Sequence, residues 1–345
     1  MPRFEAFDRR TILKAGAATA ALPALGSPAL SAAAGRPVKI GMVAPLTGPL
    51  AAFAEADPWV LQKVRGAFGA GLNIGGVLHP IQIIERDSQS STSRAAEVAS
   101  DLILKDKVDL IVTSNTADTV NPVADQCEAN EMPCISTDSP WQPYYFGRGA
   151  TPTKGFDYTY HFFWGLEDLM DVYLKMWASL PTNKVVGAMW ANDIEGNAFA
   201  DAKTGFPPEM KKAGYTLVNP GGYPVGAQDF SAQIAKFKAA KVEIVTGVFA
   251  PPDFTTFWNQ AAQQGFKPKV ASIAKALLFP SAVQALGKAG ANLSTEVWWS
   301  PDHPFTSSLI PGLTPKVYTA EYMAASKKQW TQPIGFKFAL FEVAA

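Results

Sequence analysis

KIGMVAPLTGPLAAF, residues 39–53, is the stretch that orders the rest of the chain. Residues 38–44 form an apolar run of strand length, which Pro45 and the Gly48-Pro49 pair end abruptly. Thr47 suits a helix N-cap, and small apolar residues follow from Leu50. The stretch therefore predicts a strand, a turn and a helix start. This is the entry of a βα unit, at the strand end where ligands collect.

Two interpretations of the loop within this stretch remain open, an ordinary βα turn and a ligand-contacting loop. A phosphate cradle is not indicated, because the loop lacks both GxGxxG and GxxxxGK[ST].

Length and composition indicate a globular protein with room for more than one core. A chain of 345 residues is long enough for two ordinary domains, and it is 48% hydrophobic and 17% charged. Its 30 basic and 30 acidic residues balance without a basic stripe. Nucleic acid is therefore not expected as a partner.

The first 34 residues read as an export signal. Arg9-Arg10 precedes a short Ala-rich apolar run at residues 15–25, and an A-x-A site follows at residues 32–34. The run is too short and too weakly apolar for a membrane span. The paired arginines resemble a twin-arginine signal, with a general secretory signal as the alternative. We expect signal cleavage and a mature protein in the periplasm or outside the cell.

Strand-length and helix-length segments alternate along the remainder, which predicts parallel sheets with helical crossovers. The expected strands are 38–44, 81–85, 108–113, 133–136, 184–190, 215–218, 242–247, 270–273 and 296–300. The expected helices are 59–73, 92–105, 119–131, 166–180, 197–213 with an interruption at residues 205–208, 229–240, 253–264, 280–286 and 315–330.

The predicted fold class is α/β, with two doubly wound parallel-sheet lobes joined by a hinge near residues 155–163. The expected ranges are 1–34 for the export signal, 35–160 for the first lobe and 161–330 for the second. Residues 331–345 would begin a C-terminal segment that returns to the first lobe. Residues 335–345 read as a helix still in progress, so the C-terminal part is expected to be truncated.

At this point the chain resembles the type I periplasmic binding proteins, in particular the leucine/isoleucine/valine-binding branch that serves ABC importers. The motifs that carry the resemblance are VKIG (38–41), PLTGP (45–49), IIERDS (83–88), AAEVA (95–99), VDLIV (108–112), QDFS (228–231) and AAQQG (261–265). The resemblance covers roughly residues 38–345. It implies capture of a small carboxylate-bearing solute between two lobes by hinge closure, and ABC permease subunits as membrane partners. It implies no catalysis or cofactor, and we expect a monomer.

The resemblance also implies where a ligand would be held. In this family hydroxyl and backbone N–H groups after the fourth and fifth strands hold a ligand carboxylate. The residues expected at the site are Thr47, Phe53, Asn115, Thr116, Ala117, Asp118, Asp138, Ser139, Trp141, Trp190, Asp193, Glu195, Phe249 and Lys275. Ala117 departs from the family pattern, since a hydroxyl residue is usual there and Thr116 is the nearby donor.

Lys275 is the most informative departure from the family. The amino-acid binders place an acid there to receive the ligand's ammonium, and a lysine would repel that group and attract an anion. One hypothesis is therefore a carboxylate ligand without an α-amino group, that is, an aromatic or other organic acid. An amino acid is the alternative, with its ammonium held between Asp138, Asp193 and Glu195. The alternative without a functional role is that Lys275 is a solvated loop residue.

Other functional classes have less support. The three histidines are widely separated, so a metal site or a histidine-based triad is not indicated. A ligand sensor with the same fold and a secreted hydrolase remain alternatives. Cys127 and Cys134 leave two interpretations open, a disulfide or two buried thiols.

Overall fold

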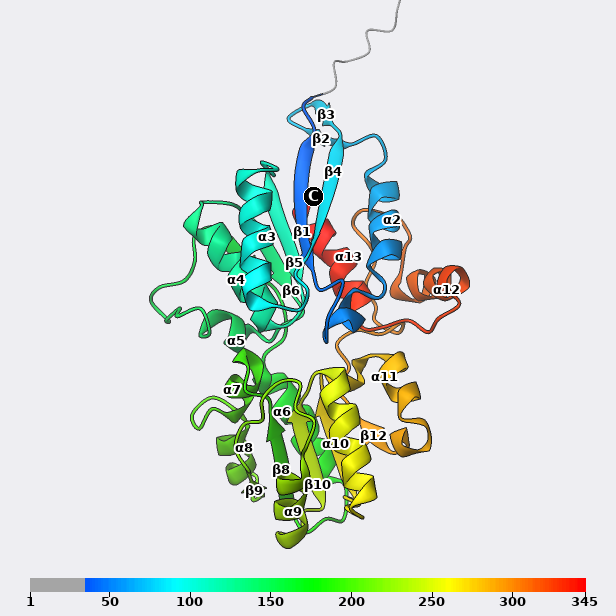
Figure 1. Cartoon of the computed structure of the whole chain (residues 1–345). Helices are drawn as coiled ribbons and strands as arrows, with labels where there is room; N and C mark the ends of the chain where they lie inside the picture. Colours follow the sequence, from blue (N-terminus) through cyan, green and yellow to red (C-terminus); the bar gives the residue numbers. More distant parts are fainter. Residues whose placement is uncertain (1–34) are drawn as a thin grey trace, which may run out of the picture.

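The computed structural model describes residues 35–345, which form two lobes, one above the other in Figure 1. The first lobe holds a five-stranded sheet in the order β4-β1-β5-β6-β7, with every neighbouring pair parallel. Its strands are β1 (Val38–Ala44), β4 (Ile81–Asp87), β5 (Leu110–Ser114), β6 (Cys134–Thr137) and β7 (Thr159–His161). The export signal expected at residues 1–34 lies outside the described residues.

Helices cover both faces of this sheet (Figure 1). Apolar residues of α3 (Thr92–Leu104) and α4 (Ala117–Ala129) pack on one face, and those of α2 (Asp57–Phe68) and α13 (Pro333–Ala344) pack on the other. A short 3₁₀ helix, η1 (Ala51–Ala54), follows β1, and α5 (Trp141–Tyr145) follows β6. A parallel sheet buried on both faces explains why its strands read as nearly continuous apolar runs.

A β-hairpin replaces the last part of the expected helix 59–73. The helix α2 ends at Phe68, and β2 (Leu72–Ile74) pairs antiparallel with β3 (Val77–His79). Gly75 and Gly76 join the two strands, both with positive φ. Two residues with positive φ are what a type I′ hairpin turn requires, so the Gly-Gly pair marks a hairpin and not a helix end.

The second lobe repeats the architecture. Its parallel sheet has the order β12-β11-β10-β8-β9. The strands are β8 (Val185–Trp190), β9 (Thr216–Val218), β10 (Ile244–Val248), β11 (Val270–Ala274) and β12 (Leu293–Ser294). The helices are α6 (Leu166–Ala178), α7 (Ile194–Ala200), α8 (Phe206–Lys212), α9 (Ser231–Ala239), α10 (Pro251–Gln263), η2 (Ala276–Leu278), α11 (Pro280–Ala285) and η3 (Gly287–Gly290). Two doubly wound parallel-sheet lobes are the fold class expected from the sequence, which is confirmed.

The chain crosses from the first lobe to the second between β7 and α6, and it crosses back after β12. The expected strand 296–300 is wrong, because this return segment makes side-chain contacts in place of strand pairing. The Trp298 backbone N–H donates to Gln332 Oε1, and Gln332 Nε2 donates to the Glu296 carbonyl at 2.9 Å. The return crossing is thus fixed to the start of α13.

The expected end of the second lobe at residue 330 lies too far along the chain. Helix α12 (Pro315–Ser326) packs beside α2 in the first lobe (Figure 1), and its Tyr318 and Tyr322 belong to the same apolar cluster as α2 and α13. Trp59 on α2 contacts both tyrosine rings, at centroid distances of 4.7 and 5.2 Å. Helical periodicity alone does not say which lobe a helix covers.

Candidate functional site

A narrow cavity, of about 20 Å³, lies between the two lobes and takes lining residues from both. It lies where the carboxyl ends of the strands in both sheets face one another, the position at which open α/β sheets bind ligands. The lining residues are Phe53, Asp138, Pro140, Trp164, Glu195, Phe199, Val248, Ala274, Lys275, Glu296 and Trp298.

Strand ends position the charged side chains of this cavity. Asp138 directly follows β6, and Lys275 directly follows β11. Both have positive φ, 70° and 69°, a conformation that is uncommon for residues with a side chain and that occurs preferentially at functional sites. Glu195 lies in the first turn of α7, where Asp193 caps the helix by accepting from the Gly196 N–H at 2.6 Å.

Lys275 is buried and already paired. Its Nζ donates to Glu195 Oε2 at 2.9 Å and to Asp193 Oδ2 at 3.4 Å. Burial opposes the charge of Lys275, but Asp193, Glu195 and Asp118 outweigh that effect and raise its pKa above the usual value. The sequence analysis treated this ammonium as free to attract an anion. The structure differs, because two carboxylates of the same lobe take up the charge.

Two hydrogen bonds join the lobes directly beside Lys275. The Ala117 N–H at the start of α4 donates to Glu195 Oε1 at 3.1 Å. In return, the Ile194 N–H at the start of α7 donates to Asp118 Oδ1 at 3.1 Å. Burial and the charge of Asp193 raise the pKa of Asp118 to about 6. The N-terminal ends of two helices therefore meet across the cleft, each facing a carboxylate of the other lobe.

Asp138 is the one carboxyl group of the cavity for which the described residues provide no hydrogen-bond partner at either oxygen. Asp138 as a whole residue is only 2% exposed. Burial raises the pKa of Asp138 to about 8; Lys337 and the nearby hydroxyl of Ser114 oppose this rise, and Asp57 increases it. A buried carboxylate without a partner is strongly unfavourable, so the group holds a proton more readily than an ordinary aspartate.

Aromatic rings form much of the remaining wall. Phe53 packs edge-on against Phe279 of the second lobe at 4.8 Å and stacks on Trp298 at 6.4 Å. Trp298 lies on the return crossing, with its ring 6.1 Å from that of Trp164 on the outgoing crossing. The two crossings therefore contribute aromatic surface to the cavity as well as connecting the lobes.

Glu296 also lines the cavity, although it is not among the residues expected there from the sequence. It is buried, and its Oε2 accepts from Tyr173 Oη and Thr295 Oγ1, both at 2.8 Å. Its Oε1 accepts from the Lys275 N–H and from Trp298 Nε1, both at 3.3 Å. Burial raises the pKa of Glu296 above its usual value. The acidic residue before the Trp298-Trp299 pair was the available signal, but those residues read as a strand.

Several expected site residues from the first lobe do not line the cavity. Thr47 is exposed and donates from Oγ1 to Asp87 Oδ2 at 2.7 Å, which ties its loop to β4. Trp141 is 36% exposed and donates to Glu167 Oε1 at 2.9 Å. Asn115 is buried and donates to Thr119 Oγ1 at 2.9 Å.

Thr116 and Ser139 are buried near the cavity without lining it. Thr116 precedes α4, and its Oγ1 has no partner among the described residues. The Ser139 carbonyl lies 2.7 Å from His161 Nε2. Burial lowers the pKa of His161 to about 4, so this histidine is neutral near pH 7.

The two expected aromatic residues of the second lobe pack into its core. Trp190 is buried against Phe199 and Phe206, and Phe249 is buried against Tyr223 and Phe254. Both follow or end a strand at the cleft edge, but their rings turn away from the cavity and into the sheet–helix interface.

Cys127 and Cys134 are buried free thiols, so of the two interpretations the structure has the unbridged one. A hydrogen bond between them and their burial raise the pKa of Cys127 above its usual value. Such thiols are inert packing groups and not nucleophiles.

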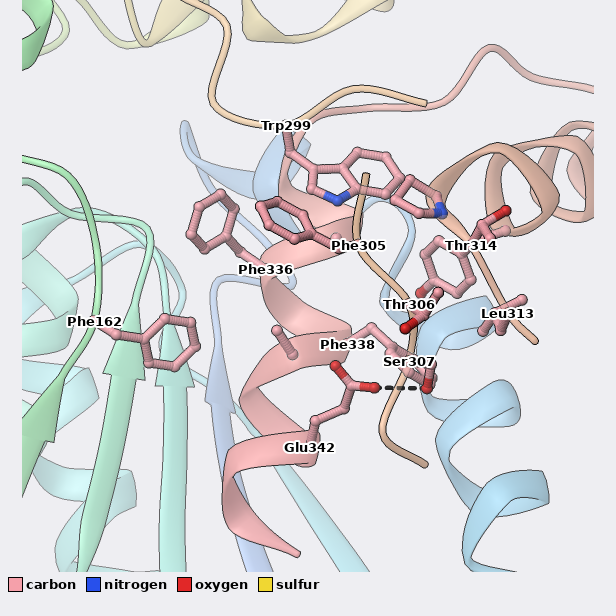
Figure 2. Close-up of a pocket in the computed structure, with 14 residues that line it drawn as sticks. Phe162, Trp299, Phe305, Thr306, Ser307, Leu313, Thr314, Phe336, Phe338 and Glu342 are labelled. Carbon is pink, nitrogen blue, oxygen red and sulfur yellow. Dashed lines mark hydrogen bonds between the residues drawn. The ribbon is translucent and has the colours of Figure 1, made fainter. Parts of the chain in front are cut away.

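A wider hollow lies on the first lobe alone, between α13 and the segment before α12 (Figure 2). Its walls are mainly apolar, with Trp299, Phe305 and Phe336 among them. Its carboxylate, Glu342, already accepts from Ser307 Oγ at 2.6 Å. This hollow differs from the charged inter-lobe cavity because its lining is mainly apolar and the second lobe contributes no residue to it.

Over residues 35–345, no helix has both the length and the apolar content needed to cross a membrane. The same residues contain no cluster of three or more His, Cys, Asp or Glu side chains placed to hold a metal ion.

Two parallel-sheet lobes that share one cavity define a class, the two-lobed binding proteins. The sequence profile of a family described as periplasmic binding protein matches residues 37–332, and the chain belongs to this family. The resemblance drawn from the sequence is thereby confirmed.

Relatives and solved structures agree with this membership. Leu/Ile/Val-binding protein homolog 3 of Brucella melitensis biotype 1 is 25% identical over 266 residues, covering 76% of this chain and 63% of the relative. The chain thus spans between about half and two thirds of the length of the curated relatives it matches, at 63% and 53%.

Two solved structures share the fold. The leucine-binding protein LivK of Thermotoga maritima aligns with a TM-score of 0.72 at 19% identity, over 89% of this chain and 81% of its own. A solute-binding protein of an ABC transporter from Rhodopseudomonas palustris BisB5, in complex with 3,4-dihydroxybenzoic acid, aligns with a TM-score of 0.67 at 17% identity. That alignment covers 89% of this chain and 79% of the neighbour. These matches carry names of binding proteins and not of enzymes.

Proposed function

We propose that this chain is the extracytoplasmic solute-binding component of an ABC importer. The observation that carries the proposal is a buried cavity built from both lobes, with charged groups at strand ends and aromatic rings on both crossings. The names of the relatives support it, since they describe binding of leucine, isoleucine and valine.

The proposed mechanism is closure about the two crossings. A solute docks on the first lobe, and the second lobe moves over it until the helix ends at Ala117 and Ile194 meet their carboxylates. The closed form is then recognised by a membrane permease. A solute that contacts both lobes favours the closed form because it binds that form more tightly than the open one.

The proposed setting is the periplasm or cell exterior, reached through the cleaved N-terminal signal expected at residues 1–34. The protein would act there as a monomer, with the permease subunits as its partners.

The solute is proposed to be a small organic molecule that fits between aromatic rings. Sequence analysis leaves an amino acid and an aromatic or other organic acid as the two carboxylate-bearing classes. One neighbour binds 3,4-dihydroxybenzoic acid, and the relatives are named for branched-chain amino acids, so similarity supports both. The pairing of Lys275 with Glu195 removes the main argument for the organic acid.

Mass spectrometry of small molecules released from the purified, denatured protein tests the proposal. We expect one organic solute in a fixed ratio to protein. Adding that solute back to the ligand-free protein should quench or shift tryptophan fluorescence, because Trp164 and Trp298 line the cavity. Loss of uptake in cells lacking the gene separates transport from sensing. Turnover of an ester, amide or glycoside panel would contradict the proposal in favour of a hydrolase.

A further inference from the structure

We propose that the cavity recognises an amine: a ligand whose ammonium group pairs with Asp138 and which needs no carboxylate. This inference deepens the proposed function and rests on it, since it assigns the chemical class of the solute held between the lobes.

The first argument is the state of Asp138. Asp138 is 2% exposed and lines the inter-lobe cavity, and neither carboxylate oxygen makes a hydrogen bond of normal geometry with the described residues. The hydroxyl of Ser114 lies nearby but carries no charge, so it does not neutralise the carboxylate. Native structures leave few buried polar atoms unpaired, and each one calls for an explanation. A cationic group that enters the cavity would supply the missing partner.

The second argument is that both nearby lysines are engaged elsewhere. Lys275 donates to Glu195 and Asp193, and the buried Lys337 pairs with Asp57 between α13 and α2. No other lysine or arginine lines the cavity. Asp138 therefore lacks a cation of its own within the described part of the chain.

The third argument is the charge balance of the cavity wall. Asp138, Glu195 and Glu296 line it together with a single cation, Lys275. Lys275 is already satisfied by Glu195, so a ligand carboxylate would find no free counter-charge in the cavity wall. An ammonium group, in contrast, finds a carboxyl group without a cation, Asp138, in the same wall.

The fourth argument concerns the place where an anion would otherwise bind. The N-terminus of the 13-residue helix α4 faces the cleft, and helix N-termini favour anions. Glu195 of the second lobe occupies this position by accepting from the Ala117 N–H at 3.1 Å. The protein's own carboxylate therefore fills the anion position, and closure does not need one from the ligand.

The aromatic residues of the cavity wall indicate the chemistry of the rest of the ligand, apart from its ammonium group. Phe53, Trp164 and Trp298 line the cavity around Asp138. Aromatic faces attract ammonium groups and pack well against apolar carbon. An arylalkyl or branched alkyl primary amine has both features.

Matched probes on the full mature protein test the inference by isothermal titration. One trio shares a phenyl body: 2-phenylethylamine, phenylalanine and 3-phenylpropionic acid. A second trio shares a branched body: isopentylamine, leucine and 4-methylpentanoic acid. We expect an amine to bind at least tenfold more tightly than the acid of the same body, and no more weakly than the amino acid. Tightest binding by an acid overturns the inference, and so does binding by amino acids alone, because the ligand carboxylate would then displace Glu195. Failure of both amines to bind also overturns it.

Matched variants locate the effect. D138N should weaken amine binding about 10- to 100-fold, the range of a lost charge-assisted hydrogen bond, and leave acid binding unchanged. D157N, at an exposed carboxyl of the same lobe, should bind like the parent. Equal amine affinity in D138N and the parent overturns the assignment. If D138N does not fold, the probe trios on the parent still decide.

The molecule carried through purification separates this inference from the proposed function. A bound solute without an amino group overturns the inference and leaves solute binding intact. Absence of any bound solute, together with no response to a broad solute panel, overturns both.

Discussion

Glu195 of the second lobe accepts a hydrogen bond at 3.1 Å from the backbone N–H of Ala117 in the first lobe. The other oxygen of the same carboxylate accepts from Lys275 at 2.9 Å. One buried side chain thus joins the start of α4 to the loop after β11, which lies 80 positions away from Glu195 in sequence. Contact between the lobes and neutralisation of the buried lysine depend on the same group.

The first prediction concerns this carboxylate. Glu195→Ala should lower the free energy of unfolding by about 3–5 kcal/mol, because it leaves Lys275 buried with only the longer contact to Asp193. Adding Lys275→Met to Glu195→Ala should recover a large part of the loss. Urea unfolding of the single and double variants measures both effects. Glu97→Ala is the control, since that side chain is 60% exposed and should change stability little. Equal losses in Glu195→Ala and Glu97→Ala would contradict the buried pair.

The second prediction concerns the ion pair of Lys337 on α13 with Asp57 at the start of α2. The two side chains are 1% and 0% exposed. Lys337→Met alone should destabilise the fold by about 3–5 kcal/mol, because an unpaired carboxylate then stays buried. Removing both charges, with Asp57→Asn as the second change, should be much milder. Thermal unfolding of the single and the double variant checks the order; a double variant as unstable as the single one would contradict the prediction.

The third prediction is a stabilising substitution at Asp138. The folded-state pKa of about 8 lies above the ordinary value of 3.8, so folding favours the protonated form. Stability is then fully present below about pH 4 and is lost by about 1.4 kcal/mol per pH unit as the pH rises toward 8. Asp138→Asn removes this loss, so its gain in melting temperature should be larger at pH 8 than at pH 5. A gain that does not grow with pH would show that Asp138 titrates normally. Stabilisation together with lost binding is typical of a functional group.

The fold could be predicted because apolar strand runs and helix-length segments alternate in a regular order. Residues 38–44 were expected as a strand and form β1 with the same bounds. The hairpin after α2 was missed, because residues 59–73 continue a helical pattern and only the conformation of Gly75 and Gly76 distinguishes the turn. The lobe that α12 covers was assigned wrongly, since the choice depends on contacts with Trp59 far away in sequence.

The site could be predicted only in part, for reasons of side-chain direction and pairing. The carboxyl ends of the strands can be located from the sequence. Asp138, Glu195 and Lys275 follow such ends in the chain, and all three line the inter-lobe cavity. It does not say which face a terminal side chain takes, and Trp190 and Phe249 turned into the core. It also does not show that Lys275 pairs with Glu195, or that Asp138 lacks a charged partner of its own, because both depend on contacts between residues far apart in sequence. Glu296 and Trp298 were missed because a crossing segment has no periodic pattern.

The fourth prediction is the pH dependence of amine binding. The groups that face Asp138 from the cavity wall are Glu195, Lys275 and Glu296, and Asp57 and Lys337 act on it from within the first lobe. With a ligand-free pKa of about 8, Asp138 must release its proton to pair with an ammonium group. Affinity for 2-phenylethylamine should therefore rise about tenfold per pH unit up to pH 8 and level off above it, since the amine stays charged throughout. Isothermal titration at pH 6, 7 and 8 measures the slope, and buffers of different ionisation enthalpy measure the released proton. Asp138→Asn should abolish both the slope and the proton release. A slope of opposite sign, with tighter binding at low pH, would mean that the protonated carboxyl is the form that binds the ligand.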